Sequence, residues 1–223
     1  MTSFNRCVAP LVLALSLAAC QSTKPETSAG LTEKYPMSAS ATAPDTLVYR
    51  SPDIDIKKFT NGFYVAPVEV YSGTDAEFGD VSAADREKLA QFLRTEFIRE
   101  LGTKYKIAGA PGPGVVELKL TLAGISETRP LLSAATRLSP AGLVLAIGKS
   151  ASGMPAAFTG SVTFGAVISD GGSGQTLGAF LTRVSPNALD LSSALGTLEA
   201  ARIGITRGAE GFRAAVDRIT GKG

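Results

Sequence analysis

The sequence predicts one mixed α/β domain of the α+β type: a small mixed, mostly antiparallel sheet of roughly four to six strands with two main helices packed on one face. Apolar and polar residues alternate over residues 116–123 and 158–168, which is typical of strands with one buried face. Residues 82–102 and 193–219 instead repeat their apolar side chains every three to four positions, as helices with one buried stripe do.

The first helix has clear start and stop signals. Ser82 is expected to be its N-cap, with Asp85 three residues later resembling a capping box, and Gly102 is expected to end it. Its apolar stripe has the width of a helix that packs on a sheet, although a partner protein could use the same stripe.

The C-terminal helix is interrupted by Gly204, Gly208 and Gly211. Each glycine costs about 1 kcal/mol relative to alanine inside a helix. We therefore expect them where the helix backbone lies close to another element. Arg202 and Arg207 among them argue against a membrane-spanning helix pair.

Two further strand regions complete the predicted sheet. Residues 63–71 are rich in β-branched and aromatic side chains, and Pro67 places this strand at an edge or at a bulge because proline lacks an N–H donor. The turn at residues 170–174 should join the 158–168 strand to a hairpin partner over 175–184.

The N-terminus has the features of a bacterial lipoprotein signal over residues 1–19. Arg6 precedes a short apolar run, and Leu17-Ala18-Ala19-Cys20 resembles a lipobox. Cleavage between Ala19 and Cys20 would leave Cys20 as a lipidated, for example palmitate-bearing, N-terminus. An ordinary signal peptide with an incidental cysteine is the alternative.

Lipidation at Cys20 would attach the chain to a membrane of the bacterial envelope. Cys7 would leave with the signal, so the mature chain would have neither a free thiol nor a disulfide. Gln21 follows Cys20 where the sorting rule of enteric bacteria places Asp for inner-membrane retention. We therefore expect the outer membrane, with the domain facing the periplasm.

The segment after Cys20 is rich in Ser, Thr, Ala and Pro and shows no apolar period, which predicts a disordered tether over residues 20–46. A single domain is then expected over residues 47–223.

Residues 131–154 form an unusual stretch that is apolar from Leu138 to Ile147 yet too short to span a bilayer. A crossover that covers one side of the sheet is one interpretation. An exposed apolar flap for a lipid or a partner protein, with Leu143 and Leu145 at its centre, is the other.

Three motifs together are similar to the DUF3313 family of bacterial lipoproteins: residues 49–55, residues 65–71 (Val-Ala-Pro-Val-Glu-Val-Tyr) and the Pro-Gly-Pro-Gly turn at 111–114. The resemblance covers residues 47–220. It implies a lipoprotein with an α/β sandwich in which helices cover one side of a small sheet. It implies no catalytic residues, because the family has no agreed activity.

Residue content argues against most kinds of catalysis. The chain contains no His, which excludes Ser-His-Asp and Cys-His relays and imidazole-bound zinc. Its net charge of +2 provides no basic field for nucleic acid. The sequence has two acidic groups, Asp53 with Asp55 and Asp75 with Glu77 and Asp80. The second lies in a loop and could hold Ca²⁺ weakly, although it lacks the spacing of a calcium loop. We expect no enzyme, metal or cofactor.

The resulting hypothesis is a membrane-anchored adaptor, or accessory binding module, for another envelope protein. The alternative is a carrier of a small apolar ligand or lipid. The candidate interaction surface combines the polar faces of two strands with the apolar stretch: Glu117, Lys119, Thr121, Thr159, Ser161, Thr163, Leu143 and Leu145.

Overall fold

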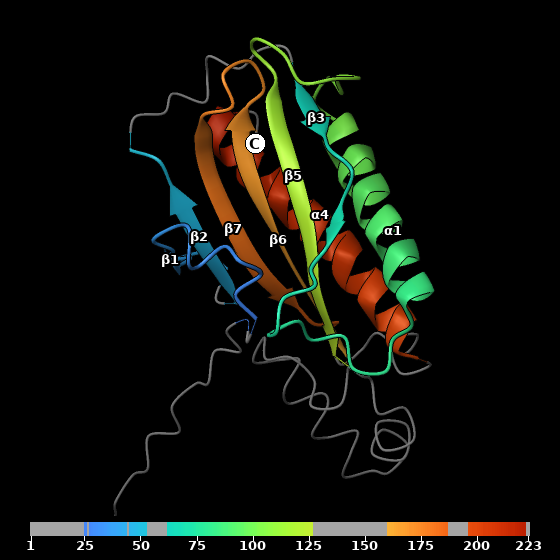
Figure 1. Cartoon of the computed structure of the whole chain (residues 1–223). Helices are drawn as coiled ribbons and strands as arrows, with labels where there is room; N and C mark the ends of the chain where they lie inside the picture. The colour runs from blue at the N-terminus through green and yellow to red at the C-terminus, as the bar shows by residue number, and fades with distance from the viewer. Residues whose placement is uncertain are drawn as a thin grey trace, which may run out of the picture.

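The computed structural model describes residues 25, 27–43, 45–52, 62–126, 160–186 and 196–221. A seven-stranded sheet forms the centre of the molecule, and two long helices lie against one of its faces (Figure 1). The predicted fold class is confirmed. The sheet has more strands than expected because the N-terminal region contributes two of them.

The sheet order is β1-β2-β7-β6-β5-β3, and β4 also pairs with β5. Its strands are β1 (Ser38–Ala39), β2 (Thr46–Arg50), β3 (Phe63–Val65), β4 (Glu69–Val70), β5 (Val116–Ser126), β6 (Ser161–Asp170) and β7 (Thr176–Val184). Only β3 and β4 run parallel to their neighbour β5. The other pairs are antiparallel, including the predicted β6–β7 hairpin.

Pro67 divides the predicted 63–71 strand into β3 and β4. Both lie on the outer side of β5, which confirms the expected edge position of this proline.

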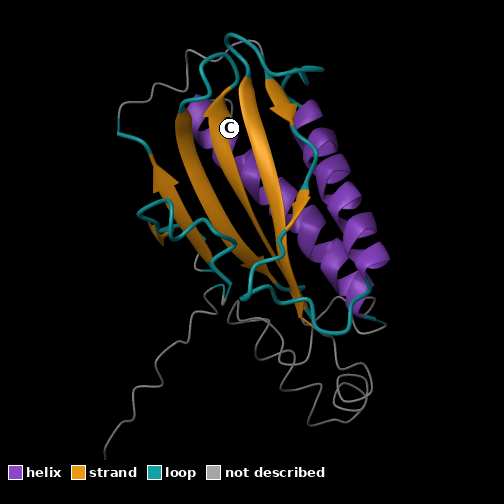
Figure 2. Cartoon of the chain, in the orientation of Figure 1, coloured by secondary structure: helices purple, strands orange, loops and turns teal. Residues whose placement is uncertain are grey.

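The helices are α1 (Ala83–Gly102) and α4 (Thr197–Thr220), and both lie on the same side of the sheet (Figure 2). The Ser82 hydroxyl accepts the backbone N–H of Asp85 at 3.1 Å, which confirms the predicted N-cap. We call this side of the sheet the helix face.

Aromatic side chains form the centre of the core on the helix face. Phe97 of α1 meets Phe164 of β6 edge to face, with ring centroids 5.9 Å apart. Phe212 of α4 lies 5.5 Å from Phe97 and 5.4 Å from Phe180 of β7. Both helices and the three longest strands thus share one cluster.

Two of the three helix glycines have the predicted role. A Cβ at Gly204 would lie 2.7 Å from Val162 Cγ1, and one at Gly208 would lie 2.3 Å from Phe164 Cζ. The missing side chains therefore let α4 approach β6 closely. The prediction is wrong for Gly211, where a Cβ would meet nothing within 4 Å.

The other side of the sheet is partly covered by a segment that was expected to be a tether. Thr27, Ala29, Leu31 and Tyr35 are all buried, and Ser38–Ala39 forms strand β1. Leu31 and Tyr35 pack with Ala179 and Leu181 in a second, smaller core. We call residues 27–39 the strap, and this side of the sheet the strap face.

The tether prediction is therefore wrong for the strap, and the folded domain begins well before residue 47. The physical reason is that Leu31, Tyr35 and Met37 bury apolar surface against a sheet that supplies the rest of this smaller core.

Candidate functional site

The strap leaves part of the strap face open, and three of the predicted surface residues lie there. Glu117, Lys119 and Thr121 occupy alternate positions of β5, so their side chains project from one face. We call these three residues the open patch. Lys119 is its most prominent member, with 59% of its side chain exposed.

Two side chains fix the geometry of Glu117 in the open patch. Lys119 Nζ lies 3.2 Å from Glu117 Oε2. The hydroxyl of Ser169, on the neighbouring strand β6, donates to the same carboxylate oxygen at 3.3 Å. The patch thus presents an acid–amine pair on rigid strands, a suitable arrangement for polar recognition.

Ser161 and Thr163 were predicted on the same exposed surface, and this prediction is wrong. Their exposed fractions are 3% and 1%. The Ser161 hydroxyl is engaged by Ser126 at 2.8 Å and by Arg183 Nε at 2.9 Å. The alternation identified the correct face of β6, but it could not show that this end of the face is covered.

The remaining predicted site residues lie outside the described residues: Ala19, Cys20, Leu143, Leu145 and Thr159.

Asp75 anchors the strap to the rest of the domain, a role that its sequence context did not predict. Its Oδ2 accepts the backbone N–H of Ser28 at 2.6 Å and the hydroxyl of Thr27 at 3.2 Å. Its Oδ1 accepts the hydroxyl of Tyr71 at 2.7 Å. The Tyr71 hydrogen bond, followed by the Ser28 N–H, holds the pKa of Asp75 well below its usual range.

The signal for the strap was present in the sequence as isolated apolar residues in a polar segment. Leu31, Tyr35 and Met37 were visible there, and all three contribute to the second core. Tyr35 stacks on Tyr49 of β2 with ring centroids 5.3 Å apart. Their burial was not predicted, because the Ser, Thr and Pro residues around them give the segment the composition of a linker.

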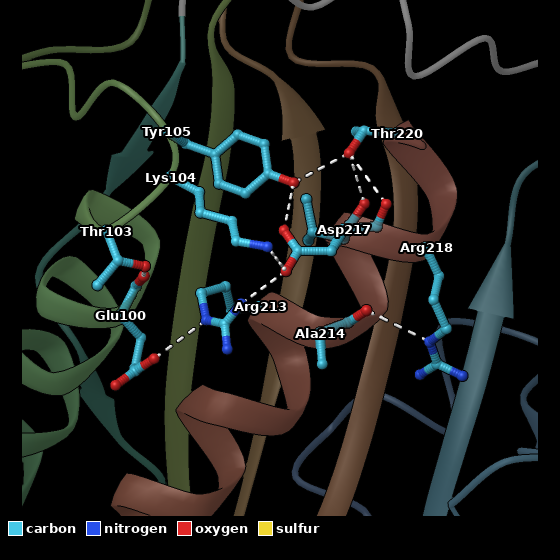
Figure 3. A network of polar contacts seen from close by, with 10 residues as sticks. Glu100, Thr103, Lys104, Tyr105, Arg213, Ala214, Asp217, Arg218 and Thr220 are labelled. Atoms are coloured by element: carbon cyan, nitrogen blue, oxygen red, sulfur yellow. Dashed lines mark hydrogen bonds and ion pairs between the residues drawn. The ribbon is translucent and has the colours of Figure 1, made fainter. Parts of the chain in front are cut away.

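A polar network joins the C-terminal ends of the two helices on the opposite side of the molecule (Figure 3). Asp217 accepts hydrogen bonds from Tyr105 at 2.7 Å, Arg213 at 2.6 Å and Lys104 at 3.1 Å. Arg213 Nε also donates to Glu100 at 3.1 Å.

This network lowers the pKa of Asp217, chiefly through the hydrogen bond from Tyr105. Asp217 and Glu100 are buried, and each carboxylate has a cationic partner. We interpret the network as a clamp between helices, because buried carboxylates need such partners to remain charged.

A shallow groove with a volume of about 420 Å³ runs along the outer surface between α1 and α4. Phe92 and Ile203 supply its apolar floor, and the Arg202 guanidinium lies over the Phe92 ring at 5.5 Å. The remaining lining residues are Glu199, Thr206, Arg207 and Glu210.

The acidic groups noted in the sequence do not form a recognisable metal centre in the described part of the chain. No three Asp, Glu or Cys side chains gather there closely enough to hold an ion. Asp53 and Asp55 lie outside the described residues. Among the helices described, none is both long and apolar enough to cross a bilayer.

The solved structures to which this chain is similar include two of the PelC dodecamer from Paraburkholderia phytofirmans. A point variant of PelC matches with a TM-score of 0.39 and 8% identity, covering 75% of this chain and 95% of that chain. A second PelC structure matches with a TM-score of 0.37 and 9% identity, over 75% and 96% of the two chains. No curated protein sequence matched.

A family model described as a protein of unknown function (DUF3313) matches residues 29–212. The match begins within the strap, which agrees with its place in the folded domain. It also confirms the resemblance seen in the sequence motifs. This chain therefore belongs to the DUF3313 family, whose function is unknown.

Proposed function

We propose that this chain is a lipid-anchored, non-enzymatic envelope protein that uses the open patch to bind another envelope protein. Two separate features support the two halves of the proposal. The lipobox at residues 17–20 supports the anchor. The open patch supports the binding role.

The observation that carries the binding role is the contrast between Lys119 and the charged side chains that connect the two helices. Asp217 and Glu100 have polar partners across elements and are buried, so they stabilise the fold. Lys119 pairs only along its own strand with Glu117, and most of its side chain faces solvent. A polar group held in place without contributing to a contact between elements is well suited to recognition.

The anchor is tested by replacing Cys20 with Ser in the full chain. We expect radiolabelled palmitate to label the wild-type protein but not Cys20→Ser, and the variant to leave the membrane fraction. Equal fractionation of the two proteins, or no label in the wild type, would refute the anchor.

The binding role is tested by placing a photo-crosslinking amino acid at position 119 of the full chain in living cells. Position 106 provides the matched control, because Lys106 is also an exposed lysine but lies outside the open patch. We expect a discrete protein adduct from position 119 and none from position 106. Adducts of equal yield from both positions, or none from 119, would count against the patch.

Native mass spectrometry of a chain that begins at residue 25 distinguishes the adaptor from the alternative role, a carrier of an apolar ligand. This start keeps the strap, which a start at residue 47 would remove. A co-purified lipid mass would favour the carrier over the adaptor.

A further inference from the structure

The position at which the strap enters the fold bears on how the domain is oriented at a membrane. Thr27 is 1% exposed, and both its hydroxyl and the Ser28 N–H are bound by Asp75. The chain therefore enters the fold at a fixed point, and the free length before that point is short.

The loop that carries Asp75 is attached to the end of β5. The backbone N–H of Tyr71 donates to Leu122 O at 2.9 Å, and that of Glu77 donates to Ala123 O at 3.2 Å. The N–H of Ile125 donates back to Glu77 O at 2.6 Å. Thr27 thus lies near the end of the sheet where β5 finishes and β6 begins, marked by the Ser126–Ser161 hydrogen bond. We call this the near end.

The opposite end of the sheet carries two turns. Residues 109–114 precede β5, residues 171–175 join β6 to β7, and the Gly171 N–H donates to Val115 O at 2.8 Å. We call this the far end. Figure 1 shows the two ends separated by the full length of β5.

Chain length relates these two ends to the membrane. From Cys20 to Thr27 the chain advances seven residues. Fully extended, these residues reach about 25 Å. The eleven residues of β5 span about 36 Å. We call the stretch from Cys20 to Thr27 the leash. Its greatest reach is shorter than β5, and it joins the fold at the near end.

We propose that the near end of the sheet faces the lipid surface and that the far end projects away from it. This inference rests on the anchor at Cys20 given under the proposed function. The open patch lies in the first half of β5, toward the far end, so it would be held away from the leaflet, where another envelope protein could reach it.

The test uses the acylated mature chain in vesicles of phosphatidylethanolamine and phosphatidylglycerol. An introduced cysteine would be the only free thiol, because Cys7 is removed and Cys20 is modified. Thr74→Cys marks the near end and Ala110→Cys marks the far end, and both residues are exposed in loops. A fluorophore on each thiol is quenched by lipids that carry a spin label on the headgroup.

We expect quenching at position 74 to be several-fold stronger than at position 110. Inserting a flexible Gly/Ser linker of about 20 residues after residue 24 should reduce this difference while the protein stays on the vesicles, because a longer leash no longer fixes the orientation. Equal quenching at both positions in the original chain, or stronger quenching at 110, would overturn the proposed orientation.

The failure of the anchor has a different signature. If the wild-type chain and Cys20→Ser both remain off the vesicles, the anchor and the orientation fall together. If only Cys20→Ser remains off and the two labels are quenched equally, the anchor stands and the orientation alone is wrong.

Discussion

The two faces of the sheet are covered in very different ways. On the helix face, α1 and α4 bury a large cluster that includes Phe97, Phe164 and Leu118 at 0% exposure. On the strap face, a segment without a regular helix buries six residues in its own cluster. The helix face thus contains most of the core, whereas the strap face is closed over only part of its area and leaves the open patch.

This difference teaches that the stability of the fold and its accessible surface belong to different sides of one sheet. Loss of the helix-face core would unfold the domain, whereas loss of strap contacts would free a segment and enlarge the accessible surface. Substitutions of decreasing effect can test this division.

The largest effect is expected from Phe164→Ala. The Phe164 ring contacts Phe97 and Phe180 in the buried aromatic cluster, and its removal leaves a cavity that the helices cannot fill. We expect the free energy of unfolding to fall by about 3–5 kcal/mol. Urea denaturation followed by circular dichroism measures this loss. Phe92→Ala, at a half-buried groove position, serves as the control and should cost clearly less.

A smaller loss is expected from Leu31→Ala. Leu31 is 6% exposed, and a Cβ on Gly165 would lie 2.5 Å from Leu31 Cδ1, so the strap packs directly on the β6 backbone at this point. We expect a loss of about 2 kcal/mol, the low end for such a truncation, because a single chain segment can readjust.

Limited proteolysis distinguishes this local effect from global unfolding. Leu31→Ala should accelerate cleavage within residues 27–43 before the helices are cut. Thr32→Ala, at an exposed neighbouring position, should cleave at the wild-type rate. Simultaneous cleavage throughout the Leu31→Ala chain would contradict the separation of the two faces.

The smallest effect concerns the dependence of strap docking on pH. The pKa of Asp75 is lowered in the folded protein, so on acidification the unfolded chain binds a proton first. The stabilisation is therefore fully present above the ordinary carboxyl pKa, near pH 4, and is lost as the pH falls through the lower folded value.

Hydrogen exchange of the strap amides at pH 3 and pH 6 measures this effect. We expect the wild-type strap to exchange faster at pH 3, after correction for the intrinsic rate. Asp75→Asn should show a weaker pH dependence, because its amide does not titrate. An unchanged dependence in Asp75→Asn would assign the effect to other groups, such as Asp217 on the helix side, whose pKa is also lowered.

The helix face was predictable from the sequence because its signals are local. The Ser82 cap, the apolar stripe of α1 and the role of Gly204 and Gly208 follow from spacing and backbone chemistry. Gly211 could not be separated from these two, since only the three-dimensional position of β6 shows which glycines face it.

The strap face was less predictable because it depends on contacts distant in sequence. Thr27 and Ser28 bind Asp75, which lies 48 and 47 positions away in the sequence. The residues next to them give no indication of this partner. For the same reason the alternation in β6 placed Ser161 on the correct face but did not predict its burial or its hydrogen bonds with Ser126 and Arg183.

The pinning of the strap by Asp75 also has a mechanical consequence for an anchored chain. Tension applied through the lipid would load the hydrogen bonds of Thr27 and Ser28 before any strand of the sheet. Rupture of these bonds would let the strap detach and lengthen the leash, while the core on the helix face stayed folded. Detachment of the strap would thus increase the distance that the domain can reach from the leaflet.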